Sequence, residues 1–313
     1  MTVAAILSLA IKASLALTVL SVGLQATPGD GQWLFRRPAL LARSLLSMNV
    51  MMPLVALYVA VGFDLRPPVK LGLLAMAISP VPPFLASKEI KHGGEASYAV
   101  GLAAAVSLLS ILFVPASVYV LSALLATPVR MSPRVVAILV GESILLPLAV
   151  GLIVRRLAPA FSVRVAKPIA KTGVVVLTIA VIPLLIAVWP TVKLLVGNGT
   201  LVAMVLVTMA GLGAGHVLGG PAIENRLVLA LSTASRHPAV AIAIAQATFP
   251  GDGLVTTAVL LELVVVTLVS APYISHLKRE VRAVRERNAI VGISGQTPLG
   301  TRTPHFVDRR ARR

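Results

Sequence analysis

Cysteine is absent from this chain of 313 residues, and charged and aromatic side chains are scarce. The lack of cysteine excludes disulfides and thiolate metal sites. Charged residues make up 12% of the chain, whereas a soluble globular domain carries about 25%, so too few remain to cover a water-facing surface. Aromatic residues make up 4%, without the aromatic girdles and alternating strands of a membrane β-barrel. These shortages favour helices that face lipid.

Aliphatic residues are abundant instead. The chain is 57% hydrophobic and its mean hydropathy is +0.94. A helix that spans a membrane needs about 20 mostly apolar residues. Runs of this kind fall near 4–25, 39–62, 70–91, 96–125, 134–154, 172–195, 200–218, 227–249 and 254–275. The sequence therefore predicts an all-α polytopic membrane protein with about nine transmembrane helices.

Positive charge is concentrated at the C-terminal end. The net charge is +17, and ten of the 28 basic residues follow Tyr273. We expect residues 1–277 to form a transmembrane transporter domain and residues 278–313 to form a basic, disordered cytoplasmic tail. A basic tail of this kind lies near anionic lipid. It is short and rich in Gly, Thr and Arg, so the lipid bilayer is the expected partner and nucleic acid is not.

The loops also differ in positive charge, and the richer set predicts the cytoplasmic side. Alternate loops of the richer set hold Arg36, Arg37, Arg43, Lys88, Lys91, Arg155, Arg156, Arg164, Lys167, Lys171 and Arg226. The other set holds Arg66, Lys70, Arg130, Arg134 and Lys193. We therefore expect a multi-pass protein of the cell membrane with its N-terminus outside and its C-terminus in the cytoplasm.

Two of the apolar runs contain residues that interrupt a helix. The run 70–91 contains Ser79-Pro80-Val81-Pro82-Pro83. Prolines remove backbone donors and clash with the preceding turn, so Pro80, Pro82 and Pro83 predict a break. In lipid such a break must be buried in protein or line a cavity. The alternative is an ordinary loop that joins two short hydrophobic pieces.

The run 227–249 has a polar centre. It consists of Ser232, Thr233, Ala234, Ser235, Arg236, His237 and Pro238. Charged groups inside a membrane span are costly and mark functional sites by default, so these polar residues are candidates for substrate binding. The alternative is a structural Arg236 paired to Glu142 or Glu262.

The two interrupted runs occupy corresponding places in the chain. Each is followed by a long span with a late proline, Pro115 in the first case and Pro272 in the second. The predicted topology gives the two copies opposite directions, so they would be inverted repeats. Interrupted spans in corresponding positions are the best sequence indicator of a transporter binding site, because half-helix ends meet at the midplane.

At these residues the chain resembles the bile acid–sodium symporter family, from about Val22 to Pro272. Val22-Gly23-Leu24 and Arg37-Pro38 are similar to its "GLTL … HP" pattern, and Met51-Met52-Pro53 to "xMP". Ser79-Pro80 through Gly94-Glu95 resembles "CPGGTASN … GN/GD", and Arg236 through Ala241 resembles "QNxxLA". The resemblance implies a core domain with two crossed discontinuous helices and a panel domain made of the first, fifth and sixth spans.

The resemblance also shows where this chain departs from the family. The family's oxygen ligands for two sodium ions fall on Met48, Leu85, Ala86, Ala99, Ala103, Ser232 and Arg236. Sodium is a hard cation that needs oxygen ligands, and Arg236 would repel it. A shift of one residue would restore one position, at Ser87 or Asn49. We expect no sodium coupling and no metal, with fixed positive charge at Arg236 first, and at Lys88 or His237 second, in place of the bound cation.

Two further carboxylates lie inside apolar runs, at Glu142 and Glu262. Each is either structural or a proton carrier, because burial changes the affinity of a carboxyl for protons. The five histidines have no metal spacing and no Walker motif is present, so neither a cofactor nor ATP as an energy source is expected.

The leading interpretation is a secondary transporter, not an enzyme, that carries a small organic solute, which the positive charge at Arg236 suggests is anionic. Three alternatives stay open. They are a channel or non-transporting sensor, a related auxin-efflux-type carrier, and an intramembrane hydrolase that pairs Ser232 or Ser235 with His237.

The predicted orientation is testable with reporter fusions at Asn198 and Arg313. An odd number of spans and the charge asymmetry place these two positions on opposite sides of the membrane. Activity reporters that function on one side only should therefore give opposite results. Finding both positions on one side would overturn the predicted topology.

Overall fold

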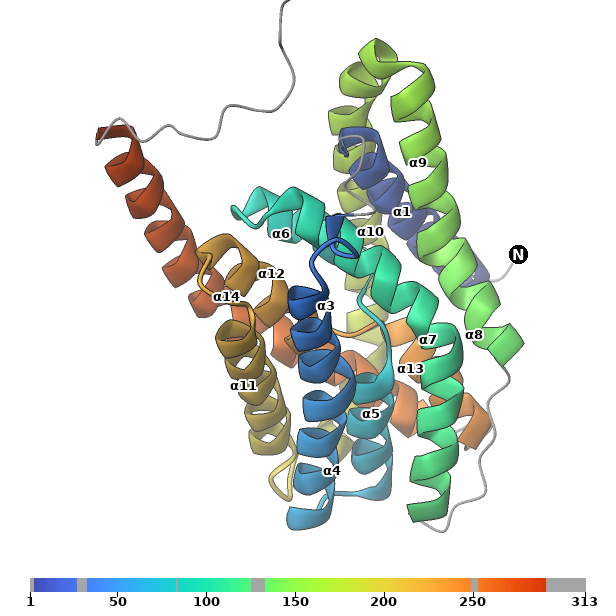
Figure 1. Cartoon of the computed structure of the whole chain (residues 1–313). Coiled ribbons are helices and arrows are strands. Elements are labelled where there is room, and N and C mark those ends of the chain that lie inside the picture. The colour runs from blue at the N-terminus through green and yellow to red at the C-terminus, as the bar shows by residue number, and fades with distance from the viewer. Residues whose placement is uncertain (1–2, 27–32, 83, 125–132, 249–252, 291–313) are drawn as a thin grey trace, which may run out of the picture.

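The computed structural model describes residues 3–26, 33–82, 84–124, 133–248 and 253–290. These residues form helices without any strand (Figure 1). The elements are α1 (Val3–Gln25), α3 (Pro38–Leu45), the π-helix η1 (Leu46–Met51), α4 (Met52–Gly62), α5 (Pro67–Ile78), α6 (Leu85–Lys91), α7 (Ala96–Leu124), α8 (Pro133–Val140), the π-helix η2 (Gly141–Leu145), α9 (Leu146–Leu157), α10 (Pro159–Leu195), α11 (Thr200–Leu218), α12 (Ile223–Ala234), α13 (Pro238–Thr248) and α14 (Gly253–Ile290).

Six stretches of the described residues are long and apolar enough to cross a membrane. They are Pro38–Gly62, Ala96–Ala123, Arg134–Leu157, Thr200–Leu218, Ile223–Ala247 and Gly253–Val284, and Leu9–Gln25 and Pro67–Ile78 are shorter apolar helices. An all-helical, multi-pass membrane protein is therefore confirmed, and the count of nine spans stays a prediction.

Both predicted interruptions are present. The α5 helix ends at Ile78 and α6 begins at Leu85, while α12 ends at Ala234 and α13 begins at Pro238. Ser79 and Ser235 each adopt an extended backbone after the preceding helix. Residues 79–82 and 235–237 are buried, as expected for backbone that leaves a helix inside a membrane protein. Pro83 lies outside the described residues.

Two π turns interrupt otherwise continuous helices. The η1 turn lies between α3 and α4, and η2 lies between α8 and α9. Each is followed by a proline at the start of the next helix, Pro53 after η1 and Pro147 after η2. A proline lacks the N–H and collides with the carbonyl four residues earlier, and the wider π turn relieves that collision. Such turns leave carbonyls available and are frequent at functional sites.

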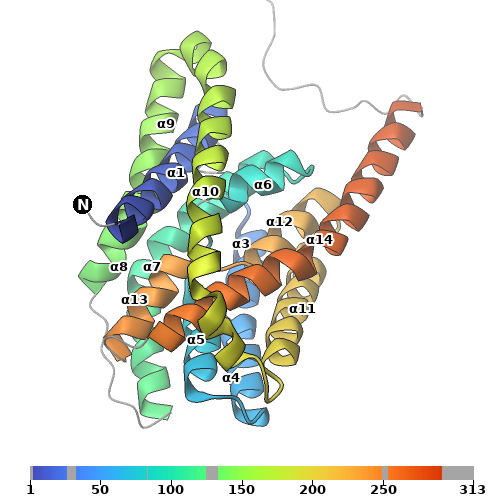
Figure 2. The same cartoon turned by 180° about the vertical axis from the view of Figure 1, so that it is seen from behind.

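In both views α1, α9 and the first part of α10 lie together at one end, and the rest of α10 runs along the other helices (Figure 1 and Figure 2). At that end, α1 packs mainly against α10 and α9. Gly23 and Gly151 allow α1 and α9 to touch, because a Cβ on Gly23 would lie 2.6 Å from the Leu148 carbonyl oxygen. Among the other helices, α5 packs against α14, α13 and α4, and α11 packs against α12 and α14.

The expected disordered tail begins as a helix. The α14 helix continues to Ile290, so residues 278–290 are helical rather than disordered (Figure 1). This segment has no proline or glycine and is rich in good helix formers. Leu277 and Val281, one turn apart, are buried, and Val281 lies against Gly93, so packing also favours the helix. Residues 291–313 lie outside the described residues.

Two glycines of α11 provide a matched test of this packing. A Cβ on Gly215 would lie 2.4 Å from the Cα of Ala230 in α12, whereas one on Gly213 would meet nothing within 4 Å. Gly215→Ala should therefore lower the stability by about 1–3 kcal/mol through overpacking. Gly213→Ala should be neutral or stabilising, since alanine is favoured over glycine in helices by about 1 kcal/mol. Thermal melting of the purified proteins measures both, and equal melting temperatures would contradict the α11–α12 contact.

Candidate functional site

The two interruptions touch each other. The backbone N–H of His237, in the second interruption, donates to the carbonyl of Pro80, in the first, at 2.8 Å. A helix that ends inside a membrane protein leaves carbonyls without partners in their own helix. Pro80 lies in the break, beyond the last residue of α5, and its carbonyl also needs a partner; the N–H of His237 supplies it and fixes the two breaks against each other.

Arg236 supplies a second and a third link. Its Nη1 donates to the carbonyl of Ser79 at 3.1 Å, and its Nη2 donates to the carbonyl of Met48. Ser79 follows the C-terminal end of α5, and Met48 lies in the η1 turn. The side chain is only 2% exposed. A fixed positive charge thus lies against the partly negative C-terminal end of α5 and against a carbonyl within the η1 turn.

Three buried polar atoms around this contact have no hydrogen-bond partner within the described residues. They are Arg236 Nε, His237 Nδ1 and Glu262 Oε2. The Glu262 carboxyl, on α14, interacts electrostatically with Arg236, but among the described residues no ion pair joins them. Glu142 lies in η2 and is exposed. The structural alternative of a direct ion pair between Arg236 and Glu142 or Glu262 therefore does not hold in this conformation.

His237 connects the second interruption to another element. Its Nε2 lies 3.1 Å from Ser143 Oγ in η2. The Ser143 hydroxyl already donates to the carbonyl of Leu139 at 2.5 Å, so the imidazole is the donor in the contact between the two side chains. A serine nucleophile needs a base that is oriented by a third group. In the described residues His237 Nδ1 has no such partner, and neither Ser232 nor Ser235 bonds His237.

The remaining predicted residues divide into two sets. Ser232, Thr233 and Ser235 are buried beside the break, and Thr233 shares a hydrogen bond of 2.8 Å with Ser47 of η1. Ser87, Lys88 and Asn49 are half-buried. Within the described part of the chain, no hydrogen bond or ion pair joins Lys88 to Arg236 or His237. The structure therefore brings together Arg236, His237 and the polar end of α12, and not Lys88.

Sequence reasoning missed a buried carboxyl. Glu89, on α6, is 1% exposed and accepts a hydrogen bond from Ser232 Oγ at 2.7 Å. Because Lys88 and Lys91 flank Glu89, the sequence suggested that this carboxyl lies at the membrane–water interface. A carboxylate within an apolar run was the available signal. Tyr98 and Ser44, whose hydroxyls lie 2.7 Å apart, are a further buried pair that no pattern marked.

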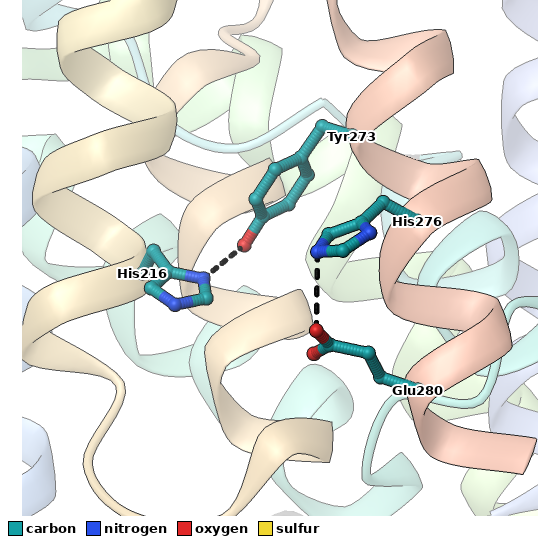
Figure 3. Close-up of polar contacts among 4 residues, drawn as sticks. All are labelled: His216, Tyr273, His276 and Glu280. Atoms are coloured by element: carbon teal, nitrogen blue, oxygen red, sulfur yellow. Dashed lines mark hydrogen bonds and ion pairs between the residues drawn. The ribbon is translucent and has the colours of Figure 1, made fainter. Parts of the chain in front are cut away.

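A separate polar cluster joins α11 to α14 (Figure 3). The Nδ1 of His216 lies 2.9 Å from the hydroxyl of Tyr273, and the two rings meet edge to face. One turn further along α14, exposed His276 and Glu280 form an ion pair at 3.1 Å. None of these residues touches the interruptions through a hydrogen bond within the described residues, so this cluster holds two helices together outside the candidate site.

A polytopic helical chain with two interrupted helices that meet through buried polar groups has the architecture of a membrane transporter. Residues 13–198 match the family described as the Sodium Bile acid symporter family, over more than half of the chain. The chain therefore belongs to the sodium bile acid symporter family, a family of membrane transporters. The matched residues include the first interruption and end before the second. No match was found among the curated proteins.

Proposed function

We propose that this protein is a secondary transporter of a small organic anion and that it works without sodium coupling. The observation that carries the proposal is the buried guanidinium of Arg236 between the carbonyls of Ser79 and Met48. Secondary transporters bind their substrates and coupling ions where interrupted helices meet. Here that place already holds a positive charge, which supports an anionic substrate.

The arginine has donors left for such a substrate. Its Nη1 and Nη2 each bond a backbone carbonyl, while Nε has no partner within the described residues. Nδ1 of the adjacent His237 also has no partner there, but because Nε2 donates to Ser143 it is an acceptor and not a donor for the substrate. Buried polar atoms of this kind normally meet a ligand or a water. A carboxylate that accepts hydrogen bonds from Arg236 would gain a charge-assisted contact.

The side chains at the family's sodium-ligand positions support independence from sodium. Met48, Leu85, Ala86 and Ala99 are buried and carry no side-chain oxygen, and the backbone oxygen of Met48 already accepts from Arg236. Sodium needs several oxygen ligands. A fixed guanidinium in the same region also repels a free cation. We propose that Arg236 fulfils permanently the role that a bound cation has at such a crossing.

The larger architecture belongs to the same proposal. We propose about nine spans in the cell membrane, with the N-terminus outside, the C-terminus in the cytoplasm and residues 1–277 as the transport domain. The two interrupted helices would belong to inverted repeats in a core domain. The packing of α1 with α9 and α10 supports a panel domain made of α1, α8–α9 and α10. Glu262, buried beside Arg236, and Glu142, exposed in η2, remain candidate proton carriers.

Sodium independence is tested by uptake of a panel of labelled carboxylates into liposomes that contain the purified protein. Uptake in sodium medium should equal uptake in choline medium of the same ionic strength, because Met48, Leu85, Ala86 and Ala99, at the family's sodium-ligand positions, carry no side-chain oxygen. A sodium-dependent increase of about tenfold, equivalent to about 1.4 kcal/mol, would contradict the proposal.

Substitutions of Arg236 test its role in substrate binding. Arg236→Ala should abolish uptake while the protein still inserts and folds. Arg236→Lys should restore only part of the activity, since lysine keeps the charge and loses the planar fork. Arg236→Gln should gain no sodium dependence, because Ser232 does not supply a carboxylate; the pair Ser232→Glu with Arg236→Gln is the smallest change that has a chance of doing so.

Melting temperatures separate this role from a purely structural one. Arg236→Ala should remain folded but melt at a lower temperature than wild type, because the carbonyls of Ser79 and Met48 lose their donor. Loss of the folded protein altogether would indicate that the guanidinium only supports the fold. Uptake at the wild-type rate by Arg236→Ala would show that the substrate binds elsewhere.

A further inference from the structure

The Glu89 carboxyl is deeply buried in the membrane domain. It lies on α6, the short helix that follows the first interruption, and its exposure is 1%. Its Oε1 accepts a hydrogen bond from the hydroxyl of Ser232 at 2.7 Å. Ser232 lies near the end of α12, immediately before the second interruption. The contact therefore joins the two interrupted helices at a second place, apart from the Arg236 contacts.

The charge of this carboxyl has no direct counterion. Among the described residues, no lysine, arginine or histidine nitrogen lies within 4.0 Å of it. A buried carboxylate without a paired cation is costly. The site is therefore stabilised when it takes up a cation.

The surroundings favour a proton over a metal ion. Leu85 and Ala86, one turn earlier on α6, present hydrocarbon to the same side of the helix. The Ser232 hydroxyl directs its hydrogen to Glu89, so its oxygen does not present a lone pair in that direction. Within the described residues there is no group of three or more His, Cys, Asp or Glu side chains that could hold a metal. A proton needs none of these ligands.

The other ionisable groups near Glu89 lie on α6 and on the elements packed against it. Lys91 is exposed, and half-buried His92 places its Nδ1 2.6 Å from the carbonyl oxygen of Lys88. Elements α7, α1 and α12 pack against α6. Lys88, on α6 itself, and Tyr98, on α7, interact electrostatically with the carboxyl. The facing part of α12 presents the Ser232 hydroxyl. Lys12, the ionisable residue of α1, is exposed. Proton uptake at this place is therefore assigned to Glu89.

We propose that Glu89 and Ser232 form a proton-binding site and that the proton held there is the coupling ion of the transporter. A proton adds to a carboxylate oxygen of Glu89 when it enters and leaves the same oxygen when it is released, while the Ser232 hydroxyl fixes the carboxyl in place. The coupling role rests on the proposed transport function, whereas proton binding at Glu89 does not.

The test measures proton binding without any organic solute. Liposomes that contain the purified protein are adsorbed on a solid-supported membrane, and the charge displaced by a pH jump is recorded. Glu89→Gln should reduce the displaced charge about tenfold, because an amide has no ionisable proton. Ser232→Ala should keep the signal and shift its pH midpoint. The control Glu280→Gln, at an exposed carboxyl of α14, should behave as the wild type.

Two results would overturn the proposal. One is wild-type charge displacement by a folded Glu89→Gln protein, and the other is loss of the signal in Glu262→Gln but not in Glu89→Gln. If Glu89→Gln does not fold, Glu89→Asp replaces it. An unchanged pH midpoint of charge displacement in Glu89→Asp would also overturn the proposal. A midpoint that sodium shifts in wild type would indicate a sodium site instead.

A second arm tests coupling with the same liposomes and a panel of labelled carboxylates. Glu89→Gln should lose accumulation driven by a pH gradient and keep exchange at equal pH on both sides. Gradient-driven accumulation at the wild-type level would refute the coupling role. If wild type carries none of the carboxylates, the proposed function fails, and the pH-jump result still decides whether Glu89 binds the proton.

Discussion

Backbone carbonyls that leave a helix inside a membrane must find donors, and this requirement organises the centre of the molecule. Arg236 donates to the carbonyls of Ser79 and Met48, and the N–H of His237 donates to Pro80. The second interruption thus supplies hydrogen-bond donors to the free carbonyls of the first, and Arg236 also bonds the η1 turn through Met48. In hydrocarbon each unsatisfied group would cost several kcal/mol. The break after α5 is tolerated because Arg236 and His237 donate to the carbonyls of Ser79 and Pro80.

A guanidinium in this place has consequences for the rest of the site. Its positive charge is part of the protein, and Leu85, Ala86 and Ala99 are hydrocarbon and buried, which supports the proposal that no cation binds at these positions. The carboxyl of Glu89 lies at a different contact, between α6 and α12. Under the two proposals, fixed positive charge and exchangeable charge lie at separate places: Arg236 would hold the breaks and attract an anion, and Glu89 would take up a proton.

The sequence predicted those features that depend on residues close together in the chain. Apolar runs of membrane-spanning length, the prolines at 80 and 82 and the polar centre around Arg236 are local, and the structure confirms helices, breaks and a buried arginine there. Partners distant in the chain were not predictable: Ser143 meets His237 across 94 positions, and Ser47 meets Thr233 across 186. A lone serine in an apolar run has no pattern that reveals its partner. The helical segment 278–290 was missed because its basic composition was weighed above its helix propensity and the buried side chain of Val281.

Chemical rescue of Arg236→Gly tests the fixed-charge account most directly. Removing the side chain leaves a space lined by the carbonyls of Ser79 and Met48, and a free guanidinium ion can donate to both. The melting temperature of the variant should therefore rise with low concentrations of guanidinium, and that of wild type should not, since a ligand stabilises only the state that binds it. Equal responses of the two proteins, or a variant that melts like wild type without any added cation, would contradict the account.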